Sequence, residues 1–130
     1  MRDVNWVQVT HASFFVLAII FSVSVALQVL IAGTALFVNS GGWAVHASFA
    51  RYFACIPLIM AIMAWMAGLS RRMLWKSMGL FGMVIGMFLT AVLSSRIGFL
   101  SALHPVIALM LFWGSVDMIR SGKRSEINVH

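Results

Sequence analysis

The stretch "LQVLIAGTALFVNSGGWAVHASFARYF" (residues 27–53) contains the pattern that decides the fold. Two apolar runs are separated by only four small or polar residues, 39–42. A helix needs about 20 mostly apolar residues to cross a bilayer, and a connection this short forces the two helices that it joins to run antiparallel. The stretch therefore predicts a transmembrane helical hairpin. Its His46 and Arg51 are ionisable groups that a bilayer tolerates only when something compensates them.

Four apolar runs of sufficient length can be placed along the 130 residues, at 14–38, 43–68, 73–93 and 102–119. Their connections are short, so the predicted fold class is all-α: an integral membrane up-down-up-down four-helix bundle in a single domain over residues 1–130. The composition agrees with this prediction. The chain is 62% hydrophobic and 9% charged, whereas a soluble domain carries about 25% charged residues.

The basic residues are distributed unevenly between the two ends of this bundle. Arg96 lies in a connection on one side, and the seven basic residues at the other end are Arg2, Arg71, Arg72, Lys76, Arg120, Lys123 and Arg124. The positive-inside rule therefore predicts a multi-pass protein of the bacterial inner (plasma) membrane with both termini in the cytoplasm. It also accounts for the net charge of +6 without a nucleic-acid partner. The lone Cys55 excludes an internal disulfide and a CxxC zinc or redox motif.

Two histidines lie near the outer ends of alternate spans. His46 is the fourth residue of the second span, and His104 follows Ser101, which is expected to cap the fourth span and to place Pro105 in its first turn. Both histidines are then about one turn inside the outer boundary, on helices that are diagonal in the bundle. Two such imidazoles can serve as axial ligands of one haem iron. The alternative is that each histidine caps its helix or bonds a carbonyl at a wet interface.

The carboxylates all belong to the cytoplasmic side. Asp3, Asp117 and Glu126 are the only ones in the chain, so Arg51 and Arg96 have no protein counter-anion in the outer half. Haem propionates, backbone carbonyls or lipid phosphates are the candidates to satisfy these arginines.

Two further polar positions carry expectations. Gln28, near the middle of the first span, is expected either to hydrogen-bond a neighbouring helix or to orient a ligand. Asp117 and Arg120 are three residues apart, which predicts a local ion pair.

The motifs "LQVLIAGTALF", "WAVHASFARYF" and "LSALHPVIALMLF" resemble a family of small, poorly characterised bacterial four-helix membrane proteins. The resemblance covers residues 21–113 and implies four spans without an established activity. More distantly, the placement of the histidines is similar to four-helix b-type haem proteins of the cytochrome b561 kind and to the halves of haem A synthase. Those proteins use more histidines, so this resemblance implies at most a single haem, near the outer surface.

The leading functional hypothesis is therefore a membrane protein that binds one b-type haem through His46 and His104, for electron transfer or for sensing or handling haem. Arg51, Arg96 and Gln28 are the further candidate cofactor contacts. A second hypothesis is a non-catalytic subunit or scaffold that binds another membrane protein or further copies of itself. A third is a small oligomeric transporter or a quinone-binding protein that uses Gln28 and Arg51. No residue pattern for hydrolysis or phosphoryl transfer is present, and whether the protein is an enzyme stays open.

Overall fold

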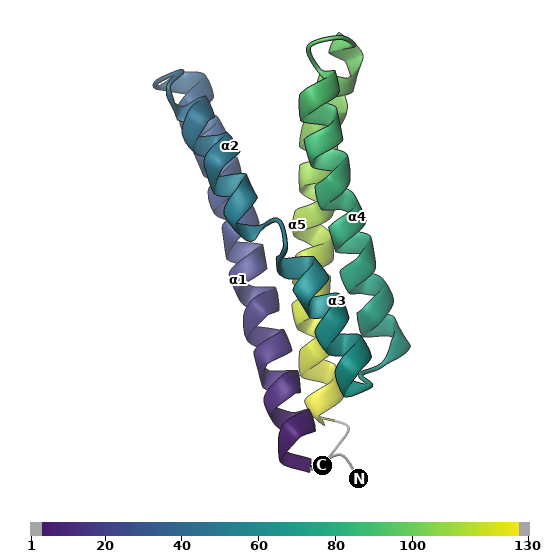
Figure 1. The fold of residues 1–130 in the computed structure, drawn as a ribbon. Coiled ribbons are helices and arrows are strands. Elements are labelled where there is room, and N and C mark those ends of the chain that lie inside the picture. Colours follow the sequence, from purple (N-terminus) through teal and green to yellow (C-terminus); the bar gives the residue numbers. More distant parts are fainter. Residues whose placement is uncertain (1–3, 128–130) are drawn as a thin grey trace.

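The computed structural model describes residues 4–127, and the side chains of residues 5–121. Regular structure in this range is entirely α-helical, which confirms the predicted all-α class. Figure 1 shows the helices, which are α1 (Val4–Phe37), α2 (Gly42–Phe53), α3 (Ile56–Ala67), α4 (Arg71–Leu93) and α5 (Gly98–Ile127).

Four stretches of the described chain are long and apolar enough to cross a membrane. They are Asn5–Phe37, Gly42–Ala67, Arg71–Leu93 and Gly98–Ser121. Of these, α1 is the longest: its 34 residues extend for about 50 Å at 1.5 Å per residue, more than the roughly 30 Å of a hydrocarbon core.

Consecutive spans run antiparallel (Figure 1), and the packing of the helices on one another closes a ring. In this ring α1 packs against α3 and α5, and α4 packs against the same two helices. The hairpin of α1 and α2 closes tightly, because a Cβ atom at Gly42 would lie 2.9 Å from the Cβ of Ala35 and 3.0 Å from its Cα. Glycine at position 42 permits this close approach of the two backbones.

The second span is not one continuous helix. It is interrupted at Ala54 and Cys55, between α2 and α3. Pro57, in the first turn of α3, is the cause, because its nitrogen cannot donate to the carbonyl four residues earlier and its ring would clash with that carbonyl. The break lets α2 pack mainly on α1 while α3 packs on both α1 and α4. In Figure 1 the α1–α2 pair therefore diverges from the α4–α5 pair toward the end that carries the α1–α2 connection.

The core follows one stripe of α1. Phe14, Ala18, Phe21 and Val25 recur at helical spacing and are each at most 3% exposed. They pack against buried side chains of the other helices, which include Phe53, Met60, Ala64, Met73, Leu80, Val84, Leu111 and Met118. A buried hydrogen bond of 2.8 Å from the Ser22 hydroxyl to the Ser115 hydroxyl joins α1 to α5 within this core.

The start of α5 differs from the sequence-based expectation. The helix begins at Gly98, so Ser101 lies within it and Pro105 is inside the helix rather than in its first turn. The chain can turn early because the Ile97 N–H donates a hydrogen bond to the Leu93 carbonyl and the Leu100 N–H donates one to the Ile97 carbonyl. Pro105 still removes one backbone donor, a loss that membrane helices tolerate where water, side chains or neighbouring helices satisfy the freed carbonyl. His104 consequently lies nearly two turns along α5.

Candidate functional site

His46 of α2 and His104 of α5 lie side by side. Their ring centroids are 6.4 Å apart and their planes are tilted by 54°. Both side chains are half-buried. The indole of Trp43 contacts the His46 ring edge-on, with centroids 5.7 Å apart. The structure thus brings together the two histidines that the sequence singled out, although they come from helices that do not otherwise pack extensively.

The hydrogen bond of His46 determines which of its nitrogens carries the proton. Its Nδ1 lies 3.2 Å from the backbone carbonyl oxygen of Gln28. A carbonyl can only accept a hydrogen bond, so Nδ1 is the protonated nitrogen of the neutral ring. The lone pair of Nε2 is then free to bind a ligand.

The same reasoning applies to His104, whose Nδ1 lies 3.0 Å from the Thr90 hydroxyl of α4. The hydroxyl has a single hydrogen, which it donates to the Met87 carbonyl at 2.9 Å. With its hydrogen on the Met87 carbonyl, the hydroxyl accepts from His104, and Nδ1 then carries the proton. Both rings expose the same nitrogen, Nε2, as an acceptor, and both are oriented from a neighbouring helix.

Gln28 provides the carbonyl that orients the His46 ring. Its side-chain amide donates to the backbone carbonyl of His46 at 2.8 Å, so α1 and α2 exchange two hydrogen bonds at this level. Its side chain is 9% exposed, and its Oε1 is buried without a hydrogen-bond partner. The expectation that Gln28 bonds a neighbouring helix is therefore confirmed. The unpaired Oε1 of Gln28 is an acceptor near His46 that can receive a hydrogen bond from a donor such as an ordered water.

Thr90 is the site residue that sequence reasoning missed. It is 7% exposed and belongs to the third span, which offered no ionisable side chain in its outer half. A hydroxyl in an apolar helix usually bonds its own backbone, as Thr90 does with Met87, so it gave no signal of contact with His104. Its distance of 14 residues from His104, across the α4–α5 connection, was the only available hint.

The two outer arginines do not reach the histidine pair in this arrangement. The Arg51 guanidinium turns back on its own helix, with its Nε donating to the Ala47 carbonyl at 3.3 Å and a terminal nitrogen donating to the Ser48 hydroxyl at 3.2 Å. Its side chain is exposed, as is that of Arg96 in the α4–α5 connection. Acceptors on its own helix thus take up part of the hydrogen bonding of Arg51. Backbone carbonyls were one of the candidate partners named from the sequence.

A protein-only metal site requires more ligands than this pair supplies. Among the residues that the structure describes, no group of three or more His, Cys, Asp or Glu side chains could hold a metal ion. Two histidines are too few for a tetrahedral zinc site, which takes three or four protein ligands.

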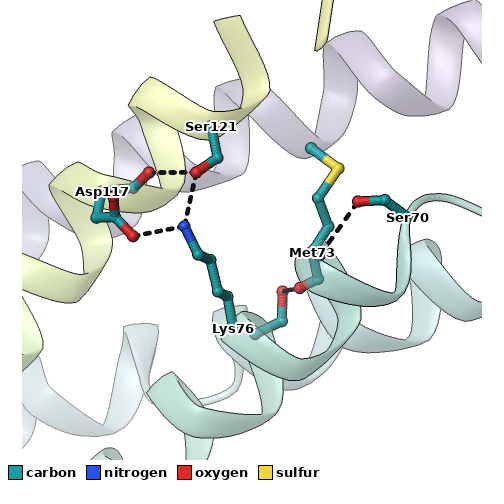
Figure 2. A network of polar contacts seen from close by, with 6 residues as sticks. Ser70, Met73, Lys76, Asp117 and Ser121 are labelled. Carbon is teal, nitrogen blue, oxygen red and sulfur yellow. Dashed lines mark hydrogen bonds and ion pairs between the residues drawn. The ribbon is translucent and has the colours of Figure 1, made fainter. Parts of the chain in front are cut away.

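A separate polar cluster joins α4 and α5 at the opposite end of the bundle (Figure 2). The Lys76 ammonium contacts the Asp117 carboxylate at 2.5 Å and donates to the Ser121 hydroxyl at 2.6 Å. The local Asp117–Arg120 pair expected from the sequence is therefore wrong. Packing of α4 on α5 offers Asp117 a lysine that bonds it directly, and sequence spacing alone could not reveal this partner.

Searches of curated proteins and of solved structures each found no match to this chain. A family model does match, over residues 28–95, which is more than half of the chain. The matched segment begins at Gln28 and contains His46 and Thr90, whereas His104 lies beyond it. It identifies no haem-protein family. The chain belongs to the family of unknown function DUF6220.

Proposed function

We propose that this chain is an integral membrane protein that binds one b-type haem near its outer face, with His46 and His104 as the two axial ligands. The observation that carries the proposal is the shared state of the two rings. Each is held at Nδ1 by an acceptor on a neighbouring helix, which leaves the Nε2 lone pair available. Metal-binding histidines characteristically donate their second ring N–H in this way, which fixes both tautomer and orientation.

The spacing of the rings also leaves room for an iron between them. A metal about 2.0 Å from an imidazole nitrogen lies about 3.2 Å from the ring centre, so two rings on opposite sides of it have centres about 6.3 Å apart. Tetrahedral neighbours would have centres about 5.2 Å apart. A direct N–H···N hydrogen bond would bring them to about 5 Å. The observed separation of 6.4 Å fits the first arrangement and also lies within the roughly 4.5–7 Å of an ordinary ring contact, so it permits an iron without requiring one.

The number of protein ligands suits a haem better than a bare ion. The porphyrin supplies four nitrogens, so two histidines complete a six-coordinate iron without a third protein ligand. When bound, haem would supply one-electron redox chemistry or act as the signal or cargo of a haem-handling protein. The chain's own residues would set the ligand geometry, through Gln28 and Thr90, and shield the pair on one side with the Trp43 indole.

The orientation proposed with this function places both termini in the cytoplasm and the histidine pair toward the outer face of a bacterial inner membrane. It rests on the surplus of basic residues at the end opposite the histidines. A reporter enzyme that works only outside the cytoplasm should be active when inserted at Gly41 and inactive when fused after Arg124. The reverse pattern would place the histidine pair on the cytoplasmic side and refute this orientation.

Colour tests the proposal directly. Protein purified in mild detergent from haem-supplemented cells should show a Soret band and, after reduction, the resolved visible bands of a six-coordinate low-spin haem. The measurement is an absorption spectrum of the oxidised and reduced protein, with the haem-to-protein ratio determined separately. A colourless preparation that also fails to take up added haemin would refute haem binding and favour the scaffold hypothesis.

A further inference from the structure

The Lys76–Asp117–Ser121 cluster fixes one end of the interface between α4 and α5 (Figure 2). The Ser121 hydroxyl donates to the Asp117 carbonyl at 2.9 Å and accepts from Lys76, so all three side chains are held in a single arrangement. The carboxylate of Asp117 therefore forms its ion pair with Lys76.

Two further cations lie beside this cluster, toward the end of the bundle. Arg72 precedes Lys76 by four residues on α4, and Arg120 follows Asp117 by three residues on α5, spacings that place each on the same helix face as its neighbour. Both lie close enough to Asp117 to act on its charge, and both side chains are exposed. Because the Asp117 carboxylate already pairs with Lys76, the exposed guanidinium groups of Arg72 and Arg120 face solvent or lipid.

The start of α4 is an unusual place for positive charge. Arg71 and Arg72 occupy the first turn of a 23-residue helix, where the helix dipole favours anions and disfavours cations. Backbone amides of the same turn point outward, and Ser70 satisfies only that of Met73 through its side chain. Among the described side chains at this end, Arg71, Arg72, Lys76 and Arg120 are basic and Asp117 is acidic, so one carboxylate faces four cations and cannot neutralise them.

We propose that Arg72 and Arg120, which both lie about one turn from the Lys76–Asp117 pair toward the same end of the bundle, bind the phosphate of an anionic lipid headgroup. A lipid is the occupant because the site lies at the level of a bilayer interface. Trp75 is next to Lys76 and is 70% exposed, and Trp65, near the end of α3 that faces the α4 start, is 73% exposed. Exposed tryptophans at the ends of apolar spans mark the headgroup layer. This site does not depend on the histidine pair or on bound haem.

The test compares lipid binding by two charge-matched double variants of the full chain. In Arg72→Gln/Arg120→Gln, binding of phosphatidylglycerol, measured by native mass spectrometry in detergent, should weaken roughly 30-fold, since each basic residue near an anionic surface contributes a factor of about five. Arg51→Gln/Arg96→Gln, which loses the same charge at the other end, should bind it within about twofold of the unmodified chain. Phosphatidylcholine, which has no net charge, should bind all three proteins alike.

Three outcomes would overturn the proposal. Equal weakening in the two double variants would mean attraction by overall charge. Displacement of phosphatidylglycerol by millimolar inorganic phosphate would mean a site for free phosphate. An unchanged affinity in Arg72→Gln/Arg120→Gln would mean that the arginines only set topology. Should that double variant fail to fold, Arg120→Gln alone should weaken binding about fivefold, whereas Arg120→Lys, which keeps the charge, should retain most of it.

Discussion

Replacing either His46 or His104 with alanine is expected to remove most of the bound haem. In the proposed site each histidine would supply one of only two protein bonds to the iron, and the described residues offer no third His, Cys, Asp or Glu ligand that could replace it. Haem affinity should fall by more than the 10–100-fold that is typical for loss of a residue that only orients a ligand. Any haem retained should change from a low-spin to a high-spin spectrum, measured by absorption at equal protein concentration.

His11→Ala is the matched control, because it removes a histidine from the first half of α1, at the end of the bundle opposite to His46 and His104. It should leave the spectrum and the haem-to-protein ratio unchanged. If the three alanine variants retain haem equally, the assignment of His46 and His104 as ligands is wrong.

Thr90→Val adds an intermediate case. It keeps the size of the side chain and removes the hydroxyl that accepts from His104 Nδ1. Haem affinity should fall by about 10–100-fold while the spectrum of the remaining bound haem stays low-spin, since both ligands survive.

Phe21→Ala is expected to be the most destabilising single change in the core. Phe21 is fully buried and packs edge-on against Phe53, with ring centroids 5.8 Å apart, where α1 meets the end of α2. Truncating a buried phenylalanine in a soluble protein costs about 3–5 kcal/mol, through lost contacts and the cavity that remains. Lost packing contacts are also the main penalty inside a bilayer, where lipid offers no hydrophobic drive for helix association. A large fall in the midpoint of thermal unfolding in one detergent should report it.

Phe37→Ala provides the comparison, since this phenylalanine lies on the same helix and is 84% exposed. Its midpoint should stay close to that of the unmodified chain. A similar fall in both variants would show that the side-chain contacts of Phe21 do not carry the stability of the bundle.

The amino-acid sequence alone was sufficient to predict the class of fold. Uninterrupted apolar length and short connections dictate four membrane-length helical stretches, because a bilayer requires every backbone polar group to be satisfied within its own helix. The candidate ligands His46 and His104 were also visible, since an ionisable residue in an apolar run stands out against its surroundings.

The details of each helix were less predictable. Pro57 and Pro105 are both prolines in apolar runs, yet one separates α2 from α3 and the other lies inside a continuous helix. Whether a proline ends a helix or is accommodated within it depends on whether neighbouring groups satisfy the backbone carbonyl that it leaves without a donor. That depends on how the bundle packs.

Sequence by itself determined the number of apolar stretches, the asymmetry of charge and the identity of the outstanding polar residues, because these follow from composition and from distance along the chain. Tertiary structure alone decided which polar groups meet. Thr90 orients His104 from another helix, Gln28 holds His46 from a third, and Lys76 rather than Arg120 pairs with Asp117. These contacts join residues 14 to 41 positions apart, and their geometry depends on the rotation and register of whole helices, which local sequence does not encode.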